Sequence, residues 1–198
     1  MFEKVKSIKE LSKEINHINS KCIDEEGRHI IKINVSDDTN FLSPYYLNDS
    51  PIISSDTASF LEHSIKHLTP ATKLHFVFVS NQINDEEKKI YEKAIDNYYH
   101  LEFLELTRSK KRKTIYSIIM LMVAIAIFAL VLTLNYFNVK QLFLNLIDVA
   151  AWVFMWEAVD IYFFQRSTIR ISQLKCLDIM TAKISFIDKK EGYENEKN

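Results

Sequence analysis

The sequence predicts a small α/β (α+β) cytoplasmic domain fused to a transmembrane helical hairpin. Three observations predict this fold class. Residues 114–139 carry no charged side chain and directly follow a hexad, residues 108–113, in which five positions are basic. A second apolar run begins after a short link, and two strand-like runs flank a helix signal in the acidic first half of the chain. The net charge of −1 over 198 residues therefore conceals a strong segregation of charge.

The first 84 residues are expected to form the cytoplasmic domain. Apolar residues at spacings of three and four predict an amphipathic helix over residues 2–20. His29–Val35 and Leu74–Val79 predict strands because both are rich in β-branched or aromatic residues. The polar, proline-containing segment after the first strand predicts a loop.

The segment between these strands predicts a helix that Ser55 or Asp56 caps and that ends near Leu68, before Pro70. A strand, helix, strand order favours a parallel pair joined by a right-handed crossover. Because two strands make a marginal sheet, we expect a third one, and Lys183–Ile187 in the tail is the candidate.

Residues 85–113 are acidic at their start and basic at their end, which matches the helix dipole, and contain no glycine or proline. One long helix is therefore predicted from Asp85 to Leu134. Its part before the membrane, residues 85–113, is expected to pack on the tail, residues 165–198, or on a second protomer. The expected contact stripes are Ile90, Ala94, Ile95, Tyr98, Leu101 and Leu104 on the long helix and Ile171, Leu174, Leu177 and Met180 on the tail.

Two stretches are long and apolar enough to cross a bilayer, which takes about 20 helical residues. The first is Ile115–Leu134, and the second, Leu142–Phe164, returns across the bilayer although three acids interrupt it. A helix lying in the membrane interface is the alternative for the second stretch, but it would need one strongly polar face. We therefore expect residues 114–164 to form a transmembrane hairpin.

Basic residues next to membrane helices tend to stay in the cytoplasm, and here they flank the outer ends of the hairpin. Because no signal peptide is expected either, both termini are predicted to be cytoplasmic. The basic cluster serves as a topology determinant or also attracts anionic lipid, at about 1 kcal/mol for each basic residue. The residues of this cluster are Arg108, Lys110, Lys111, Arg112 and Lys113.

Several sites are not favoured by the sequence. Gly27 and Gly192 are the two glycines of the chain, so the glycine-built phosphate motifs are missing. Cys22 and Cys176 are far apart, and His63 and His67, although spaced like metal ligands on a helix, lack the glutamate that a zincin motif places between them. We expect no cofactor, no metal and no nucleic-acid partner, and because nothing pairs a nucleophile with a base, an enzyme is not favoured.

Asp148, Glu157 and Asp160 lie within the second apolar stretch, where each charge costs on the order of 3 kcal/mol. At about 100° per residue, Glu157 and Asp160 share a face that Asp148 does not. In the structural interpretation, Glu157 and Asp160 pair with basic residues, and Asp148 bonds to polar residues near the external turn. The basic candidates are Arg112, Lys113 and Arg166, and the polar candidates are Asn145, Thr133 and Tyr136. The functional interpretation is an unpaired carboxyl with a raised pKa, as in a proton relay.

Two further sets of residues have a structural and a functional interpretation. Trp152 and Trp156 lie inside the span, where packing on the first helix or on another protomer competes with ligand binding. Polar residues follow the first strand, where open α/β sheets bind ligands, although a capped polar loop is the simpler interpretation. These loop residues are Asp37, Asp38, Ser43, Tyr45 and Tyr46, with Asp49 further along.

Four passages, NFLSPYYLNDSPIISSDTASFLEHS, FVFVS, DEEKKIYEKAIDNYY and DVAAWVFMWEAVDIYFFQR, resemble a family of uncharacterised small two-pass bacterial membrane proteins. The resemblance covers roughly residues 28–187, and WEAVD at 156–160 is its most specific part. It implies a bacterial inner membrane and directs attention to residues 37–53 and to the intramembrane acids, but it transfers no reaction.

Two functions compete at this point. In the first, the cytoplasmic domain senses a ligand or partner and passes that state to an oligomeric hairpin that acts as a gated ion or proton leak. In the second, the hairpin is a non-conducting anchor or scaffold for a cytoplasmic protein. The lipid bilayer is the expected partner in both. Further copies of the chain are also expected, and the leak requires several of them because two helices cannot enclose a pore alone.

Overall fold

The computed structural model describes residues 23–46, 49–80, 83–137 and 140–187. These residues divide into two compact units, which we call the sheet domain (up to residue 101 and from residue 174) and the hairpin unit (residues 102–173). The helix predicted over residues 2–20 lies outside the described residues.

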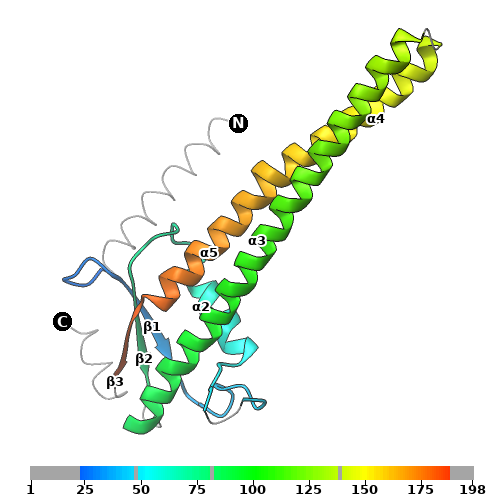
Figure 1. Cartoon of the computed structure of the whole chain (residues 1–198). Helices are drawn as coiled ribbons and strands as arrows, with labels where there is room; N and C mark the ends of the chain where they lie inside the picture. The colour runs from blue at the N-terminus through cyan, green and yellow to red at the C-terminus, as the bar shows by residue number, and fades with distance from the viewer. Residues whose placement is uncertain (1–22, 47–48, 81–82, 138–139, 188–198) are drawn as a thin grey trace. The chain divides into compact units, whose positions relative to one another are not determined.

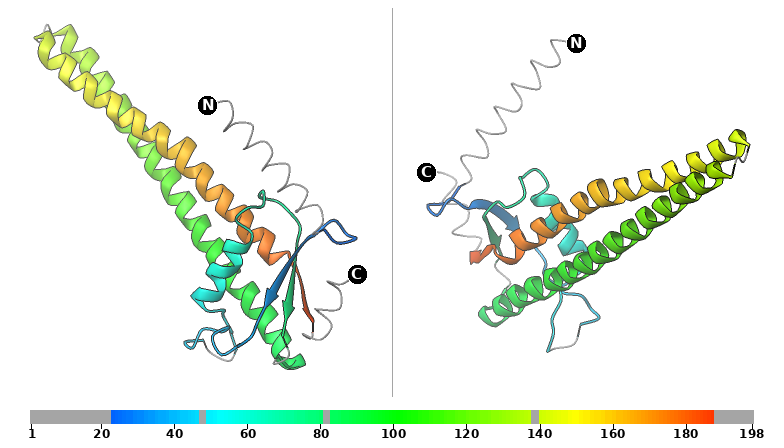
Figure 2. Two further views of the ribbon diagram at one scale, coloured as in Figure 1. Left: turned by 180° about the vertical axis from the view of Figure 1, so that it is seen from behind. Right: turned by 45° about the horizontal axis from the view of Figure 1, so that its top comes forward.

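The sheet domain is built on three parallel strands in the order β1-β2-β3 (Figure 1). These are β1 (His29–Asn34), β2 (Leu74–Val79) and β3 (Lys183–Ile187), and they lie side by side in both views of Figure 2. The predicted parallel pair and the third strand from the tail are thus confirmed, with Ile31, Phe76 and Ile184 in register across the sheet.

The core of the sheet domain forms against β2. Alternate residues of this strand, Leu74, Phe76 and Phe78, are at most 1% exposed, as the two-residue period of a strand dictates. Helix α2 (Ser55–Ser64) buries Ala58 and Leu61. Its N-cap is Ser54, rather than the predicted Ser55 or Asp56, and the Ser54 hydroxyl accepts a hydrogen bond from the Thr57 N–H at 3.2 Å.

Helix α2 also ends earlier than predicted, at Ser64 instead of near Leu68. After Ser64 the backbone forms tighter 3₁₀-type turns. The Lys66 N–H donates to the His63 carbonyl and the Leu68 N–H to the Ile65 carbonyl, in each case three residues back. His67 therefore lies beyond the helix, so the helical spacing expected for His63 and His67 does not occur.

The predicted long helix is confirmed as α3 (Asp85–Tyr136), a helix of 52 residues. The Glu87 carboxylate accepts the Asn84 N–H at 2.8 Å and so closes the start of the helix as one half of a capping box. The contact stripe predicted for this helix lies partly on the wrong face. Ala94 and Ile95 are buried, but Tyr91 and Tyr99 accompany them, whereas Ile90, Leu101 and Leu104 are exposed.

The second helix of the hairpin continues beyond the predicted apolar span Leu142–Phe164. Helix α4 (Gln141–Asp160) continues through one π-helical turn, η1 (Ile161–Gln165), into α5 (Arg166–Met180). The predicted stripe of the tail is also out of phase. Ile171 and Leu177 are exposed, while α5 buries Ile169, Cys176 and Ile179.

In the hairpin unit, α3 packs on α4 through buried residues spaced seven apart. Ser117 and Ala124 of α3, and Leu144, Ala151 and Ala158 of α4, are at most 5% exposed. Small residues let two helices approach closely, and the Ser117 hydroxyl donates to the Ala158 carbonyl at 2.7 Å. We call these five residues the seam.

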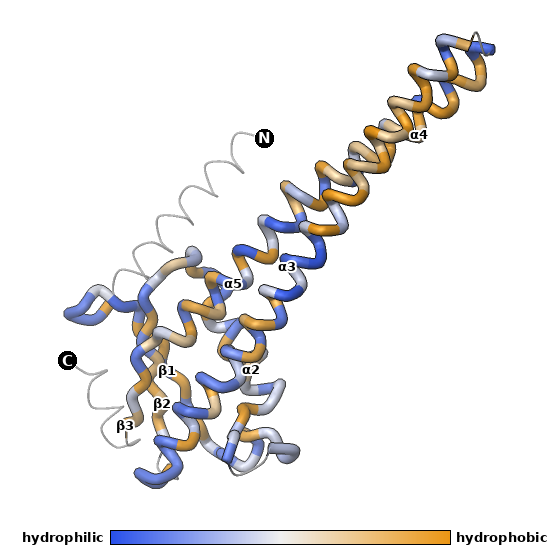
Figure 3. The backbone as a smooth tube through the Cα atoms, viewed as in Figure 1, coloured by the Kyte–Doolittle hydropathy of each residue, from blue (hydrophilic) through white to orange (hydrophobic). Residues whose placement is uncertain are grey.

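On their other faces, these two helices expose large apolar side chains. In the most apolar 18-residue windows of the two helices, 11% and 17% of the residues are buried. Figure 3 shows the apolar residues concentrated along α4 and the neighbouring part of α3, directly after a hydrophilic segment of α3. Both helices are long and apolar enough to span a membrane, and few residues of either apolar window are buried within the chain.

Candidate functional site

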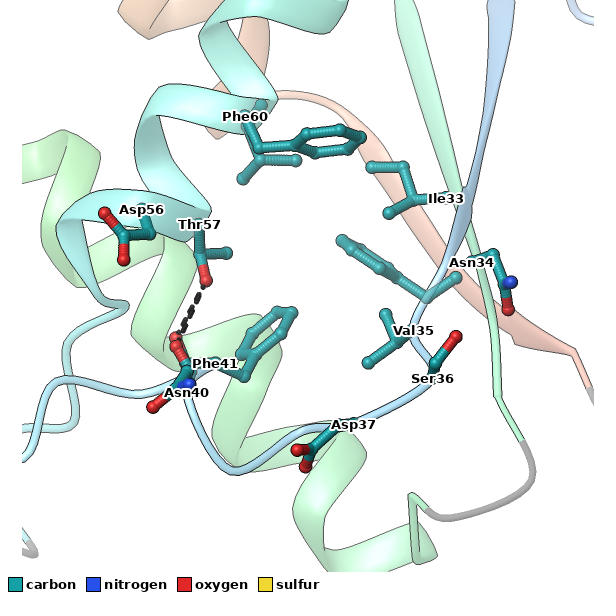
Figure 4. Close-up of a pocket in the computed structure, with 12 residues that line it drawn as sticks. Ile33, Asn34, Val35, Ser36, Asp37, Asn40, Phe41, Asp56, Thr57 and Phe60 are labelled. Atoms are coloured by element: carbon teal, nitrogen blue, oxygen red, sulfur yellow. Dashed lines mark hydrogen bonds between the residues drawn. The ribbon is translucent and has the colours of Figure 1, made fainter.

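A cavity of about 380 Å³ opens at the carboxyl end of β1, where open α/β sheets bind ligands (Figure 4). Three aromatic side chains, Phe41, Phe60 and Phe78, line it together with Ile33 and Leu61. They come from the loop after β1, from α2 and from β2. Most of the cavity wall is therefore apolar.

Polar groups occupy the remaining wall of this cavity. Thr57 donates its hydroxyl to the Phe41 carbonyl at 3.3 Å, which ties the first turn of α2 to the loop after β1. The Thr39 hydroxyl, and then the Thr39 N–H, donate to Asp37 and hold the pKa of this carboxyl below its usual range. Asp56, in the first turn of α2, is the second acid. No lysine, arginine or histidine lines the cavity among the described residues.

The structure separates the predicted loop residues. Asp37 lines the cavity, whereas Asp38 accepts the Tyr91 hydroxyl at 2.9 Å. Burial and this hydrogen bond to Asp38 raise the pKa of Tyr91. Tyr45 is 94% exposed, and the Ser43 N–H donates to the Ile52 carbonyl, so these residues do not form one site. Tyr46 donates its N–H to the Ser43 carbonyl within the same turn.

Three polar residues that the sequence analysis missed form a continuous hydrogen-bonded line in the sheet domain. His75 on β2 has its Nδ1 3.1 Å from Asp24 Oδ2 and its Nε2 2.9 Å from Ser185 Oγ on β3. The expectation that nothing pairs a nucleophile with a base is therefore wrong, because this order of groups is that of a Ser-His-Asp triad. The sequence signal was a polar residue between apolar neighbours in each of two strands, His75 in β2 and Ser185 in β3.

Asp24 is fixed in turn by backbone donors. The N–H groups of Arg28 and Glu26 donate to its Oδ1 at 2.8 and 2.9 Å. The Arg28 N–H contributes most to holding the pKa of Asp24 below its usual range, and His75 contributes further. The side chains of His75 and Asp24 are 14% and 15% exposed, so the line is partly open to solvent.

In the hairpin unit, the three acids have different surroundings. Asp160 accepts the Gln165 amide at 3.0 Å across η1, in place of the predicted basic partner. Asp148 is half-buried on α4, and Asn145, one of its predicted partners, accepts from Gln141 instead. Glu157 is exposed, and its carboxylate has no ion pair or hydrogen bond with the other described residues.

A cleft of about 380 Å³ lies beside Glu157. It brings the basic cluster next to this acid, since Arg112 and Lys113 line the cleft together with Ser109, Tyr116, Glu157, Ile161 and Gln165. Lys110 is directed elsewhere, because its Nζ donates to Gln173 Oε1 at 3.2 Å. Arg108 and Lys111 are exposed and are not among the residues of the cleft.

The two tryptophans also differ. Trp152 packs edge-to-face on Phe128 of α3, with ring centroids 6.2 Å apart, which confirms packing on the first helix. Trp156 is 72% exposed on the outer face of α4. Arg166, one of the predicted partners of the acids, lies instead over the Tyr162 ring at 5.1 Å.

The part of the chain that the structure describes contains no cluster of three or more side chains that could hold a metal ion. No family model, curated protein or solved structure matches this chain.

Proposed function

We propose that the protein is a two-pass integral membrane protein whose cytoplasmic sheet domain senses a ligand or partner and couples that state to a hairpin assembled from several copies. The observation that carries the proposal is the outer surface of the hairpin unit. Large apolar side chains such as Leu132, Leu142, Leu146 and Trp156 are more than 70% exposed along it.

Water is a poor solvent for such a surface. The largest apolar patch of a soluble monomer covers about 300–600 Å², whereas here apolar side chains cover the outer faces of two long helices. The seam is built in the opposite way, because four of its five residues are Ala or Ser and the hydroxyl of Ser117 is hydrogen-bonded, as expected where lipid surrounds a helix pair.

The cavity at the end of β1 supports the sensing half of the proposal. Its aromatic wall suits the apolar body of a small molecule, and its two acids, with no described base beside them, favour a neutral or cationic ligand over a phosphate-bearing one. Helices α3 and α5 each begin in one unit and end in the other, which gives the chain two continuous connections for passing on the bound state.

Insertion into the membrane is the first property to test. The protein should remain in the bilayer after an alkaline carbonate wash, and Val153→Asp, on the outer face of α4, should release or destabilise it. Leu101→Asp is the matched control, because Leu101 is similarly exposed but lies in the sheet domain. Release of the unchanged protein by carbonate would contradict the proposal.

The number of protein copies in the assembly distinguishes a hairpin that acts as a leak from one that acts as a non-conducting anchor. Because the seam is closed by packed side chains, a water path needs several hairpins around it. In lipid nanodiscs, a ring of four or more copies supports a leak, and Glu157→Gln or Asp160→Asn should then change ion flux without dispersing the ring. A monomer or dimer, or unchanged flux in both variants, supports the non-conducting anchor instead.

The Asp24, His75 and Ser185 line favours a second candidate function, acyl transfer in the sheet domain. In this reaction the Ser185 oxygen attacks a carbonyl carbon, His75 takes the hydroxyl proton, and the leaving group departs with that proton. A fluorophosphonate probe tests it, since the serine oxygen would bond to phosphorus and release fluoride. Labelling at Ser185 that His75→Gln abolishes supports catalysis, and the absence of labelling assigns the line to structure alone.

A further inference from the structure

The cleft beside Glu157 contains charges of both signs. Arg112 and Lys113 of α3 line one side, and Glu157 of α4 lines the other. Among the described residues, no ion pair or hydrogen bond joins Glu157 to either base, although flexible side chains of opposite charge share one cavity. A ligand that carries both a negative and a positive group can therefore satisfy all three side chains.

The place of the cleft in the sequence indicates what kind of ligand reaches it. Arg112 and Lys113 are the last charged residues before the uncharged stretch 114–139. In the proposed membrane this is the depth of the lipid headgroups. Tyr116 in the cleft, and the Tyr162 and Arg166 pair nearby on the second helix, are residue types that prefer this interface.

The π-helical turn η1 contributes to the shape of the cleft. Two of its residues, Ile161 and Gln165, line the cavity, and Gln165 is held by its hydrogen bond to Asp160. Single π turns within α-helices are frequent at functional sites, where the extra residue displaces the backbone. The cavity thus has one wall that a regular helix would not provide.

We propose that this cleft binds the headgroup of an aminophospholipid, with phosphatidylethanolamine as the simplest case. The phosphate lies between Arg112 and Lys113, and the ammonium group donates to the Glu157 carboxylate. This inference rests on the proposed membrane function and deepens it, since it replaces a diffuse attraction of the basic cluster for anionic lipid with a selective site for one headgroup.

The test uses the intact protein in nanodiscs that contain equal amounts of three lipids, with retained lipid measured by native mass spectrometry. Phosphatidylethanolamine should be retained over phosphatidylcholine, which has the same phosphate but no N–H donor, and over phosphatidylglycerol, which has no amine. Glu157→Gln should remove this preference for the amine. Retention of phosphatidylethanolamine relative to phosphatidylcholine should fall about tenfold, because one charge-assisted hydrogen bond is lost.

A matched pair of variants separates the cleft from the general charge of the cluster. Arg112→Gln with Lys113→Gln should abolish selective retention. Arg108→Gln with Lys111→Gln removes the same charge outside the cleft and should preserve it. Equal losses in both pairs, equal retention of the three lipids, or a preference for phosphatidylglycerol in the unchanged protein would overturn the proposal.

Membrane insertion is measured on the same sample by flotation after a carbonate wash. If the protein inserts but shows no preference for the amine, the headgroup site is wrong and the proposed function stands. If the protein fails to insert into vesicles of any of the three lipids, both proposals are wrong.

Discussion

At the scale of single residues, buried polar atoms tie the sheet domain together. Tyr99 is the largest fully buried side chain of the described residues, and its hydroxyl donates to the Ala58 carbonyl at 3.2 Å. This bond joins α3 to α2 inside the core. Asp24 acts in a similar way near the strands, because it binds the backbone of its own turn and His75 together.

Replacing Tyr99 by Phe should lower the free energy of unfolding of the sheet domain by about 1 kcal/mol, the usual contribution of one hydrogen bond. Tyr45→Phe is the control, since Tyr45 is 94% exposed and should have no measurable effect. Thermal unfolding of both variants in the same nanodiscs measures the difference. Equal stability of the two variants would show that the buried hydroxyl contributes nothing.

Replacing Asp24 by Asn should destabilise the sheet domain in a pH-dependent way. The pKa of Asp24 is lowered from 3.8 in the fold, chiefly by the Arg28 N–H, so the carboxylate stabilises the fold above its unfolded pKa. That contribution disappears as the pH falls through the lowered pKa. Melting temperatures of the two proteins should therefore differ at neutral pH and converge in acid below pH 3.8.

The titratable and charged groups near Asp24 include His75, Glu25, Glu26, Arg28 and Lys183, and Glu26 forms ion pairs with the last two. His75→Gln separates the effect of the imidazole from that of the backbone donors, because it removes one partner of the Asp24 carboxylate and keeps the N–H groups that bind it. A difference between Asp24→Asn and the unchanged protein that persists at constant size into acid would contradict the assignment.

At the scale of elements, the sequence predicts those helices and strands whose presence depends on the composition and length of a local segment. The strands, the helix from Asp85 and the two apolar spans follow from local signals, and all are present. The phase of α3 does not follow, because Ile90 and Tyr91 are both apolar and only the position of the sheet decides which one is buried. The π turn in IYFFQ has no local signal of its own.

The candidate sites show the same division. Asp37 follows the first strand directly and could be predicted, since ligand sites recur at that end of a parallel sheet. The aromatic wall and the Asp24, His75 and Ser185 line could not, because their members come from segments far apart in the sequence. Ser54 as the cap of α2 was equally hidden among adjacent serine and aspartate residues that can all accept an N–H.

The π turn keeps the buried residues of the second helix in phase. Ile161 and Ile169 are buried eight positions apart, while Ala151 and Ala158 are seven apart. Because one extra residue is accommodated in the π turn, the eight positions turn the helix through about the same angle as seven in a regular α-helix.

Deletion of Phe163 from η1 should therefore be tolerated, since the turn becomes a regular α-helix and Ile169 keeps its direction. Deletion of Val153, which is also exposed, should disrupt the hairpin, because it rotates Ala158 by about 100° relative to Ala151. Melting temperatures of the two deletion variants in nanodiscs measure the contrast. Equal losses would show that η1 does not set the phase.

At the scale of the whole molecule, the sheet domain is discontinuous in sequence, since β3 and the end of α5 come after the hairpin. A fragment that ends at Leu101 lacks β3 and the buried residues Cys176 and Ile179. It should not unfold cooperatively. The same fragment with residues 174–187 attached through a flexible linker should recover a cooperative transition by circular dichroism, and a stable shorter fragment would contradict this prediction.

Biosynthesis adds a constraint that follows from the parallel strand β3. The ribosome releases β1 and β2 before the apolar helices and β3 after them, so the edge of β2 stays unpaired while the hairpin is being synthesised. An exposed strand edge invites pairing with other chains. Strand β3 thus completes the sheet only after the hairpin has been synthesised, so the sheet domain matures only when synthesis of the apolar helices is complete.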